Sequence, residues 1–261
     1  MDILLVEDNE NIVNGLEYAF SKNNYNLVSK MDIKSAIEYL NDNIKDLAGD
    51  YICVSNVHTT VTAWEDPEYR DIQNGGVMAV PDGVPLVWVS HWRGFKQTER
   101  TDGPRYMVEM LKESVKLGYR HFFYGSTQET LNKMRAVLDR DYPEVQVVGM
   151  YSPPFRSLTE EEDEAIIQMI NETKADFVWV GLGAPKQEIF MAAHRGKING
   201  FMVGIGAGFD YLAENIKRAP MWMQKCSLEW FYRMLQDPKR LFWRYVRTNA
   251  IFVWQAIIRK R

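Results

Sequence analysis

Cysteine is scarce in this chain, and its scarcity excludes two kinds of site. Cys53 and Cys226 are the only cysteines among 261 residues, and they lie far apart in the sequence. Two isolated cysteines provide neither a disulfide framework nor the closely spaced set that binds zinc. We expect both to be ordinary apolar residues in a reducing compartment, and we expect no metal site.

Long apolar runs are also missing. The longest candidate, residues 250–258, is far shorter than the roughly 20 residues that span a bilayer. The opening MDILLVEDNE has acids where a secretion signal has bases. These two absences predict a cytoplasmic protein with no membrane-spanning helix.

A third absence concerns dinucleotides. Glycine turns follow three apolar runs, in FYGST, VGLGAPKQE and VGIGAGFDYLAE, but none has the spacing G-x-G-x-x-G with an acid about 20 residues later. Small residues at such turns let the backbone approach a phosphate, and the following helix offers free N–H groups. The turns therefore favour another phosphate-bearing ligand. The alternative is that these glycines only permit tight packing of strand on helix.

The chain does contain a regular alternation of strand and helix patterns. Its length and its 46% apolar content fit one large domain, or one domain with a small appendage. Continuous apolar strands separated by helices indicate an α/β fold, with a mostly parallel sheet covered on both faces. The expected strands are 51–56, 77–82, 121–126, 145–151, 176–183 and 200–208, and the expected helices are 61–74, 103–116, 127–139, 159–171 and 186–196.

The stretch VMAVPDGVPLVW, residues 77–88, places one carboxylate at a strand end. An apolar run stops at Pro81, Asp82 and Gly83 follow, and a second apolar segment begins a helix. Ligands of open α/β sheets bind at the carboxyl ends of the strands, so Asp82 is a candidate functional residue. Asp-Gly is also a common turn pair, and a purely structural role for Asp82 remains open.

The C-terminal segment differs from the rest in charge and in aromatic content. Residues 217–261 contain eleven Lys and Arg against two acids, a net charge of +9, so that the remainder carries −13. Two helices are expected there, 228–235 and 238–257, with Asp237 capping the second. Interleaved aromatic and basic side chains suit an anionic membrane surface. Packing of the aromatics on the body, with the bases solvated, is the alternative, and no motif indicates nucleic-acid binding.

The first thirty residues resemble the start of a two-component receiver domain. Strands are expected at 3–6 and 26–28 and helices at 11–21 and 33–40, and Glu7 and Asp8 match an acidic pair that helps to hold magnesium in receivers. The next strand, YICVSN, lacks the aspartate that accepts the phosphoryl group. We expect a receiver-like segment without phosphotransfer; alternatively, Glu7 and Asp8 only cap the following helix.

From about residue 31 to 252 the chain resembles the WecG/TagA/CpsF family of bacterial glycosyltransferases. The resemblance is carried, in order, by ICVSNVHTTV, DPEYRDI, VPDGVPLVW, TERTDGPRYM, FYGST, YSPPF, TEEEDEAII, VGLGAPKQE, GIGAGFDYLAE, KRAPMWMQ and LEWFYRMLQDPKRLFWRY. It implies a Rossmann-like fold and metal-independent, inverting transfer of a sugar, often N-acetylmannosamine, from a UDP-sugar. The implied acceptor is a sugar on undecaprenyl diphosphate at the inner face of the membrane, for cell-surface polysaccharide or teichoic acid synthesis.

The resemblance also implies roles for particular residues. Asp82 matches the proposed base, Asn56 a substrate-binding asparagine, and Arg100 an arginine that meets the sugar or a phosphate. An inverting transfer needs such a base, and it needs cations or N–H groups to hold the departing diphosphate. The expected substrate-binding residues are Ser55, Gly83, Gly125, Gly181, Gly183, Lys186, Gln187, Gly206, Asp210, Arg233, Arg240 and Arg244.

Three parts of this interpretation remain open. Many relatives have Thr where this chain has Val54, so that any hydroxyl role falls to Ser55 or is absent. The expected organisation is a receiver-like segment at 1–30, the transferase domain at 31–216 and a helical appendage at 217–261. The sequence determines neither homo-oligomerisation nor the particular sugar.

Two competing hypotheses for the function are a nucleotide-dependent oxidoreductase on the same sheet and a non-enzymatic signalling protein.

Overall fold

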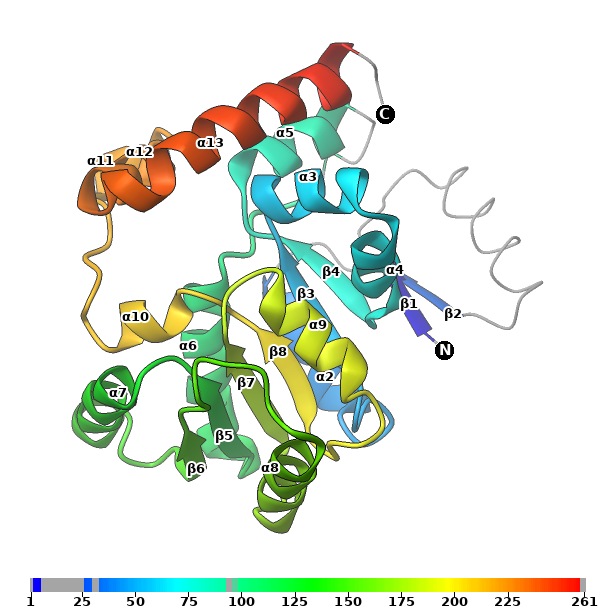
Figure 1. Ribbon diagram of the computed structural model, residues 1–261, viewed down its shortest axis with the longest axis vertical. Helices are drawn as coiled ribbons and strands as arrows, with labels where there is room; N and C mark the ends of the chain where they lie inside the picture. The colour runs from blue at the N-terminus through cyan, green and yellow to red at the C-terminus, as the bar shows by residue number, and fades with distance from the viewer. Residues whose placement is uncertain (1, 6–25, 30–32, 93–95, 97, 259–261) are drawn as a thin grey trace.

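A sheet of six parallel strands forms the centre of the computed structural model, which describes residues 2–5, 26–29, 33–92, 96 and 98–258 (Figure 1). The six expected strands and the α/β class are confirmed. In spatial order the strands are β4 (Met78–Pro81), β3 (Tyr51–Ser55), β8 (Phe201–Gly204), β7 (Phe177–Gly181), β5 (Arg120–Gly125) and β6 (Gln146–Tyr151).

Helices cover both faces of this sheet, as the continuous apolar strands predict. One core cluster joins Ile52 and Val54 of β3 to residues of α2 (Ile33–Asn43), α6 (Gly103–Leu117) and α7 (Gln128–Asp141). A second joins Tyr51 and Cys53 to α8 (Glu160–Glu172) and α9 (Lys186–Ala193). Successive residues of β3 thus serve opposite layers, because side chains alternate along a strand.

The helix expected at 61–74 is wrong as a single element. Two helices occupy this region, α3 (Val57–Glu65) and α4 (Pro67–Gly75), and they meet at Asp66. The Asp66 carboxylate accepts hydrogen bonds from the backbone N–H groups of Glu68 and Tyr69, at 3.0 and 3.2 Å, and so caps α4. Pro67 has no N–H to continue α3, but it fits the first turn of α4.

The C-terminal helices are confirmed, although their capping differs from expectation. The segment contains α12 (Glu229–Gln236), α13 (Pro238–Val253) and a π-helical turn, η1 (Trp254–Ile258). Asp237 precedes α13, but its side chain makes no capping bond; it pairs with Arg240 at 2.7 Å instead. Two five-residue helices, α10 (Gly208–Leu212) and α11 (Met221–Lys225), were not expected, since they are too short to show a periodic pattern.

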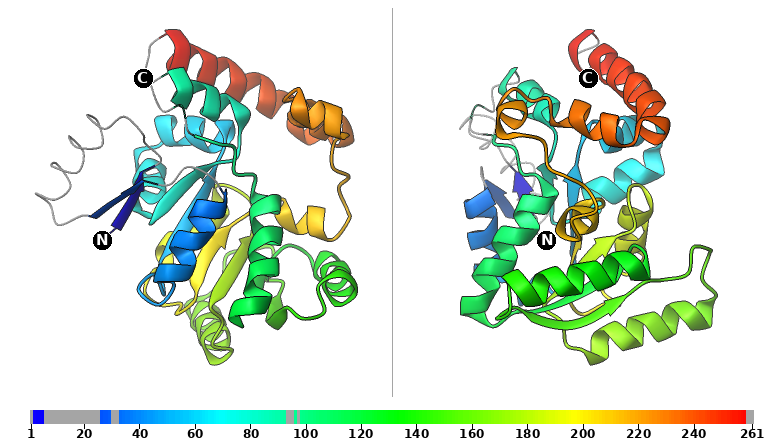
Figure 2. Two further views of the ribbon diagram at one scale, coloured as in Figure 1. Left: turned by 180° about the vertical axis from the view of Figure 1, so that it is seen from behind. Right: turned by 90° about the vertical axis from the view of Figure 1, so that its left-hand side faces the viewer.

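Helix α13 packs on the body through a small core of its own. It lies across α3 and near α5 (Val84–Trp92), the helix expected after Asp82 and Gly83 (Figures 1 and 2). Phe252 stacks on Trp64 with ring centroids 5.6 Å apart, and Arg247 pairs with Glu65 at 2.7 Å. Part of the aromatic set therefore does pack on the body. In the described ranges no helix is both long and apolar enough to cross a bilayer.

The N-terminal strands stand apart from the main sheet. β1 (Asp2–Leu5) and β2 (Asn26–Ser29) pair in parallel, and β1 contacts β4. The expected strands at 3–6 and 26–28 are confirmed in place, as is the helix at 33–40, which is α2. Glu7, Asp8 and the expected helix at 11–21 lie outside the described residues. The receiver-like interpretation and the three domain boundaries stay predictions.

Candidate active site

The carboxyl ends of β3 and β8, neighbouring strands, form the edge at which the candidate residues gather. The chain leaves β3 into α3 and α4, which reach α9 on one face of the sheet. It leaves β8 into α10, whose Phe209 packs in the core of the other face. Adjacent strands whose following helices lie on opposite faces leave a crevice beyond their ends, where α/β proteins bind ligands.

Asp82 lies at this edge, directly after β4. Its backbone N–H donates to the carbonyl of Ser55 at the end of β3, at 2.7 Å, and the preceding carbonyl of Pro81 accepts from Thr101 N–H at 2.8 Å. The backbone is therefore fixed on both sides. The side chain retains 29% of its surface exposed, so the carboxylate is accessible from the edge instead of lying within the core.

Arg100 connects Asp82 to the C-terminal appendage. Its Nε donates to the Asp82 backbone carbonyl at 2.6 Å, and its Nη1 donates to Glu229 Oε2 at 2.8 Å. Its Nη2 lies 3.6 Å from Asp82 Oδ1. Glu229 was missed by the sequence analysis. The signal for it was an acid standing almost alone in a strongly basic segment.

The surroundings of Asp82 raise its pKa to about 6. Burial is the largest cause, and the negative charges of Asp102 and Glu229 act in the same direction, while Arg100 opposes them. Asp102 is held in place because it caps α6 and pairs with Arg218 at 3.2 Å. A carboxylate with a pKa near neutrality suits a general base that operates at physiological pH.

Ser55 ends β3 and Asn56 follows it, and both lie at the same edge as Asp82, as expected. The Asn56 side-chain oxygen caps α3 by accepting from the backbone N–H groups of His58 and Thr59, at 2.9 and 3.2 Å. Its amide nitrogen has no hydrogen-bond partner among the described residues and is available to a ligand. Ser55 Oγ donates to Gln73 Oε1 at 2.8 Å, which ties that hydroxyl to α4. The hydrocarbon side chain of Val54 lies buried in the core, so this position provides no hydroxyl at the edge.

Two of the glycine turns have a packing explanation. A Cβ on Gly125 would lie 2.7 Å from the backbone of Gly181, and one on Gly181 would lie 2.6 Å from the ring of Phe209. These two glycines therefore permit close packing, whatever else they do. Gly183 differs: its φ is +78° and a Cβ there would meet nothing within 4 Å, so that it leaves open space at the end of β7.

Gln187 braces the turn after β8 instead of facing solvent. It is 4% exposed, its Oε1 accepts from Gly206 N–H at 2.9 Å, and its Nε2 donates to Glu188 Oε1 at 2.8 Å. Glu188 is fully buried, and burial raises the pKa of its carboxyl. The Gln187 amide is thus used to hold the turn after β8, while the neighbouring Lys186 is exposed.

Two other residues of the body that were expected at the site, Gly83 and Asp210, have different surroundings. Gly83 lies next to Asp82, and its carbonyl accepts from Leu86 N–H in the first turn of α5. Asp210 lies in α10 and accepts from Asn215 Nδ2 at 3.2 Å, so its carboxylate is engaged locally. Tyr211, the next residue, was not expected at the site, yet it lies within electrostatic range of Asp82, Glu229 and Arg233.

The three expected arginines of the appendage have different surroundings. Arg233 lies within electrostatic range of Tyr211. Arg244 stacks over Tyr245, and its Nε is buried without a hydrogen-bond partner among the described residues. Burial lowers the pKa of His58, and the charge of Arg244 adds to this effect, so Arg244 lies within electrostatic range of α3. Arg240 is 62% exposed and pairs with Asp237, and among the described residues no contact joins it to Asp82.

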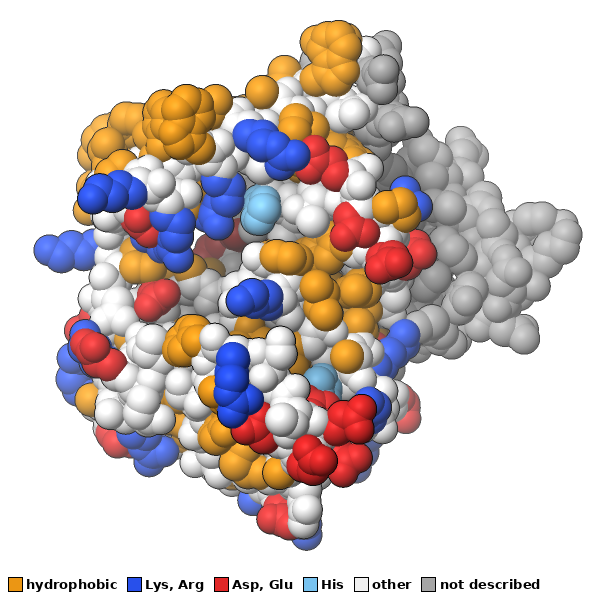
Figure 3. Space-filling view, viewed as in Figure 1, with side chains coloured by type: hydrophobic (Ala, Val, Ile, Leu, Met, Phe, Trp, Pro, Cys, Tyr) orange, Lys and Arg blue, Asp and Glu red, His pale blue; other side chains and the backbone are white. Residues whose placement is uncertain are grey.

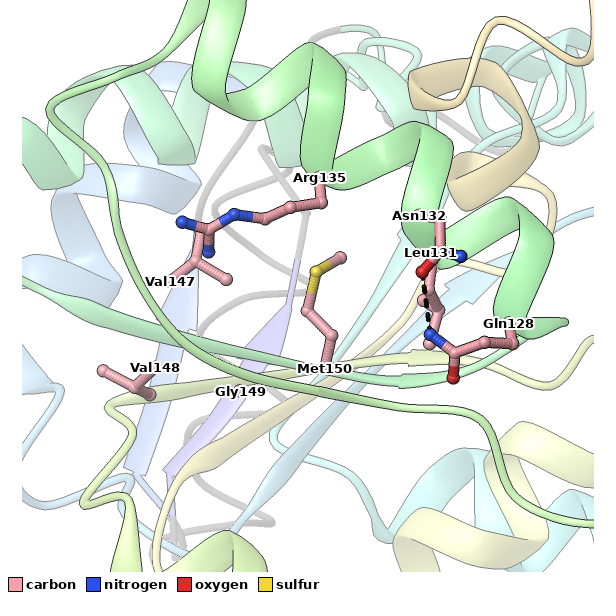
Figure 4. Close-up of a pocket in the computed structure, with 8 residues that line it drawn as sticks. All are labelled: Gln128, Leu131, Asn132, Arg135, Val147, Val148, Gly149 and Met150. Carbon is pink, nitrogen blue, oxygen red and sulfur yellow. Dashed lines mark hydrogen bonds between the residues drawn. The ribbon is translucent and has the colours of Figure 1, made fainter.

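A separate cavity of about 340 Å³ lies between α7 and the edge strand β6 (Figure 4). Gln128 and Asn132 line it and hydrogen-bond to each other, and Arg135 extends over Val147. None of the expected site residues lines it. Across the described part of the chain, no three His, Cys, Asp or Glu side chains lie close enough together to hold a metal ion.

The open parallel sheet, the partly exposed strand-end carboxylate of raised pKa and Arg100 beside it are features of the active site of an α/β enzyme. Residues 24–261 match the model of the glycosyl transferase WecG/TagA/CpsF family. The chain belongs to this family and is a glycosyltransferase, which decides against the oxidoreductase and signalling hypotheses.

Curated relatives from three bacteria share the name N-acetylglucosaminyldiphosphoundecaprenol N-acetyl-beta-D-mannosaminyltransferase. The protein of Bacillus subtilis (strain 168) is 29% identical over 84% of this chain and 83% of its own length. That of Bacillus spizizenii is 30% identical over 82% and 80%, and that of Staphylococcus aureus (strain MW2) is 28% identical over 81% of each. This chain is therefore similar to them over most of both lengths.

Proposed function

We propose that this protein transfers N-acetylmannosamine, or a related hexose, from a UDP-sugar to a sugar carried on undecaprenyl diphosphate, in cell-surface polysaccharide or teichoic acid synthesis. The names of the relatives support both the transferred sugar and the acceptor. The observation that carries the mechanism is Asp82, a partly exposed carboxylate at the end of β4 with a pKa of about 6.

In the proposed reaction Asp82 removes the proton of the acceptor hydroxyl. The hydroxyl oxygen bonds to the anomeric carbon of the donor, and the bond from that carbon to the diphosphate oxygen breaks, which inverts the configuration and releases UDP. The free amide N–H of Asn56 is placed to donate to the sugar. Arg233, within electrostatic range of Tyr211, and Arg244, within that of His58, would neutralise the departing diphosphate.

We further propose that the reaction needs no metal ion, because guanidinium groups can do the work of a cation on the diphosphate. Arg100 is not assigned to this task, since its Nε and Nη1 are bonded within the protein and its Nη2 faces Asp82. Activity that persists in excess EDTA would support this part of the proposal. Loss of activity in EDTA and recovery on adding Mg²⁺ or Mn²⁺ would contradict it.

The appendage is proposed to hold the enzyme on the inner face of the cell membrane. Trp222 and Trp243 are 62% and 74% exposed, and Phe242 and Leu235 are exposed near them. Figure 3 shows apolar side chains gathered over α11, α12 and the start of α13, with Lys and Arg side chains next to them. Exposed aromatics beside cations favour an interface with anionic lipid, where the lipid-linked acceptor would lie.

The test is a donor panel with a lipid-diphosphate N-acetylglucosamine acceptor. UDP release is expected with UDP-N-acetylmannosamine, and much less with UDP-N-acetylglucosamine, UDP-glucose or UDP-galactose. Release that depends on the acceptor separates transfer from simple hydrolysis of the donor. If no UDP-sugar in the panel gives acceptor-dependent UDP release, the proposed function is wrong.

A further inference from the structure

We propose that Glu229 is a positioning residue for the transfer reaction: from the appendage, it holds the Arg100 guanidinium off the Asp82 carboxylate, so that Asp82 is an effective base only when the appendage is docked. This inference rests on the proposed function, because it takes Asp82 as the base. It assigns a task to an acid that lies 129 residues away from Arg100 in the sequence.

The geometry around Arg100 is the first support. Its closest charged contact is Nη1 to Glu229 Oε2, at 2.8 Å, which is a charge-assisted hydrogen bond. Nη2 lies 3.6 Å from Asp82 Oδ1, a distance that makes an ion pair but is too long for a good hydrogen bond. Within Asp82, it is the backbone carbonyl that accepts a hydrogen bond from this arginine, from Nε at 2.6 Å. The guanidinium is thus anchored beside the carboxylate but directed to Glu229.

Burial is the second support. The side chain of Glu229 is 17% exposed and that of Arg100 is 29% exposed. Within the described ranges, two further ion pairs join body and appendage: Asp102 with Arg218, and the more exposed pair of Glu65 with Arg247, whose side chains are 42% and 62% exposed. Charges that are largely covered by protein are screened less by water and salt than surface pairs, so the Glu229 charge acts on its neighbours more strongly.

Charged groups face Asp82 from three places, and the titratable hydroxyl of Tyr211 in α10 lies within electrostatic range of it as well. Arg100 lies in the segment before α6, Asp102 caps α6, and Glu229 lies in α12. Asp102 is itself paired with Arg218 at 3.2 Å. Removal of the Glu229 charge would lower the pKa of Asp82 in two ways. It would delete a like charge near Asp82, and it would free Arg100 to close on the carboxylate, which favours the charged form.

The experiment compares the pH dependence of kcat/KM for UDP release in the wild-type protein and in Glu229→Gln. The acid limb of the variant should move to lower pH by roughly one unit, with a lower plateau rate because the base has become weaker. Glu229→Asp keeps the charge and should retain a limb close to that of the wild type. Melting temperatures establish that each variant is folded.

Glu65→Gln is the matched control, because it removes one negative charge from an ion pair between body and appendage that does not include a neighbour of Asp82. Its acid limb should not move. An unmoved limb in folded Glu229→Gln, even with a reduced rate, would show a merely structural role and overturn the inference. Equal shifts in Glu65→Gln and Glu229→Gln would also overturn it. Absence of UDP release by the wild-type protein would contradict the proposed function instead, before any variant is compared.

Discussion

At the scale of single residues, the environment of Asp82 sets the pH range in which the protein can work. A base must be unprotonated, and burial together with Asp102 and Glu229 raises the pKa of Asp82 to about 6. Above pH 6 most of the Asp82 carboxylate is charged and can accept a proton. Below pH 6 the charged fraction falls about tenfold for each pH unit. We predict that kcat/KM for UDP release falls on an acid limb near pH 6. A limb near pH 4 would show that these surroundings do not act on the base.

Asp82 could be predicted from the sequence because a buried strand that ends in Pro-Asp-Gly places its carboxylate locally. Glu229 could not, because its contact with Arg100 depends on the direction in which the appendage folds back. Gln187 illustrates a different limit. The sequence places it at the start of a helix at the correct edge, but only the packing of α9 against the turn at Gly206 decides that its amide is buried.

At the scale of elements, the break between α3 and α4 depends on one capping side chain. Asp66 accepts from two backbone N–H groups at the start of α4, and Tyr69 and Gln73 of that helix are hydrogen-bonded to each other. We predict that Asp66→Ala lowers the free energy of unfolding by about 1 kcal/mol, the typical contribution of an N-cap. Asp66→Asn, which can still cap, should lose much less. Equal losses in chemical denaturation would show that charge, and not capping, matters at this position.

The same region shows what periodicity can and cannot predict about elements. The apolar spacing of residues 61–74 continues through Asp66 and Pro67, so that it indicates one helix, whereas the proline ring and the capping carboxylate impose two. Strands were easier to predict. Each is a short apolar run that ends at a turn, so its bounds depend on the local sequence and not on which strands lie beside it in the sheet.

At the scale of the whole molecule, the exposed aromatics of the appendage are expected to bind membranes. Burial of a large apolar side chain contributes about 1.5–3 kcal/mol, so Trp222→Ala with Trp243→Ala should weaken binding to anionic vesicles roughly tenfold or more. Added salt should weaken it further by screening the Lys and Arg side chains. Co-sedimentation with vesicles measures both effects.

Phe155→Ala is the control for this measurement. Phe155 is 84% exposed but lies between β6 and α8, outside the appendage. Its loss should leave vesicle binding unchanged, and an equal loss in both variants would contradict a dedicated surface. The sequence predicted the basic, aromatic character of the appendage. It could not separate the exposed Trp243 from Phe252, which packs on Trp64, because that division depends on how α13 lies on α3.

The most direct test of the account is the rate of acceptor-dependent UDP release by Asp82→Asn at pH 7.5. The amide has nearly the shape of the carboxylate but cannot take a proton, so a folded variant should lose at least a hundredfold in rate, the usual contribution of a positioned base. A folded Asp82→Asn protein whose rate stays within a few-fold of the wild type would show that another group takes the proton, and the account of this site would be wrong.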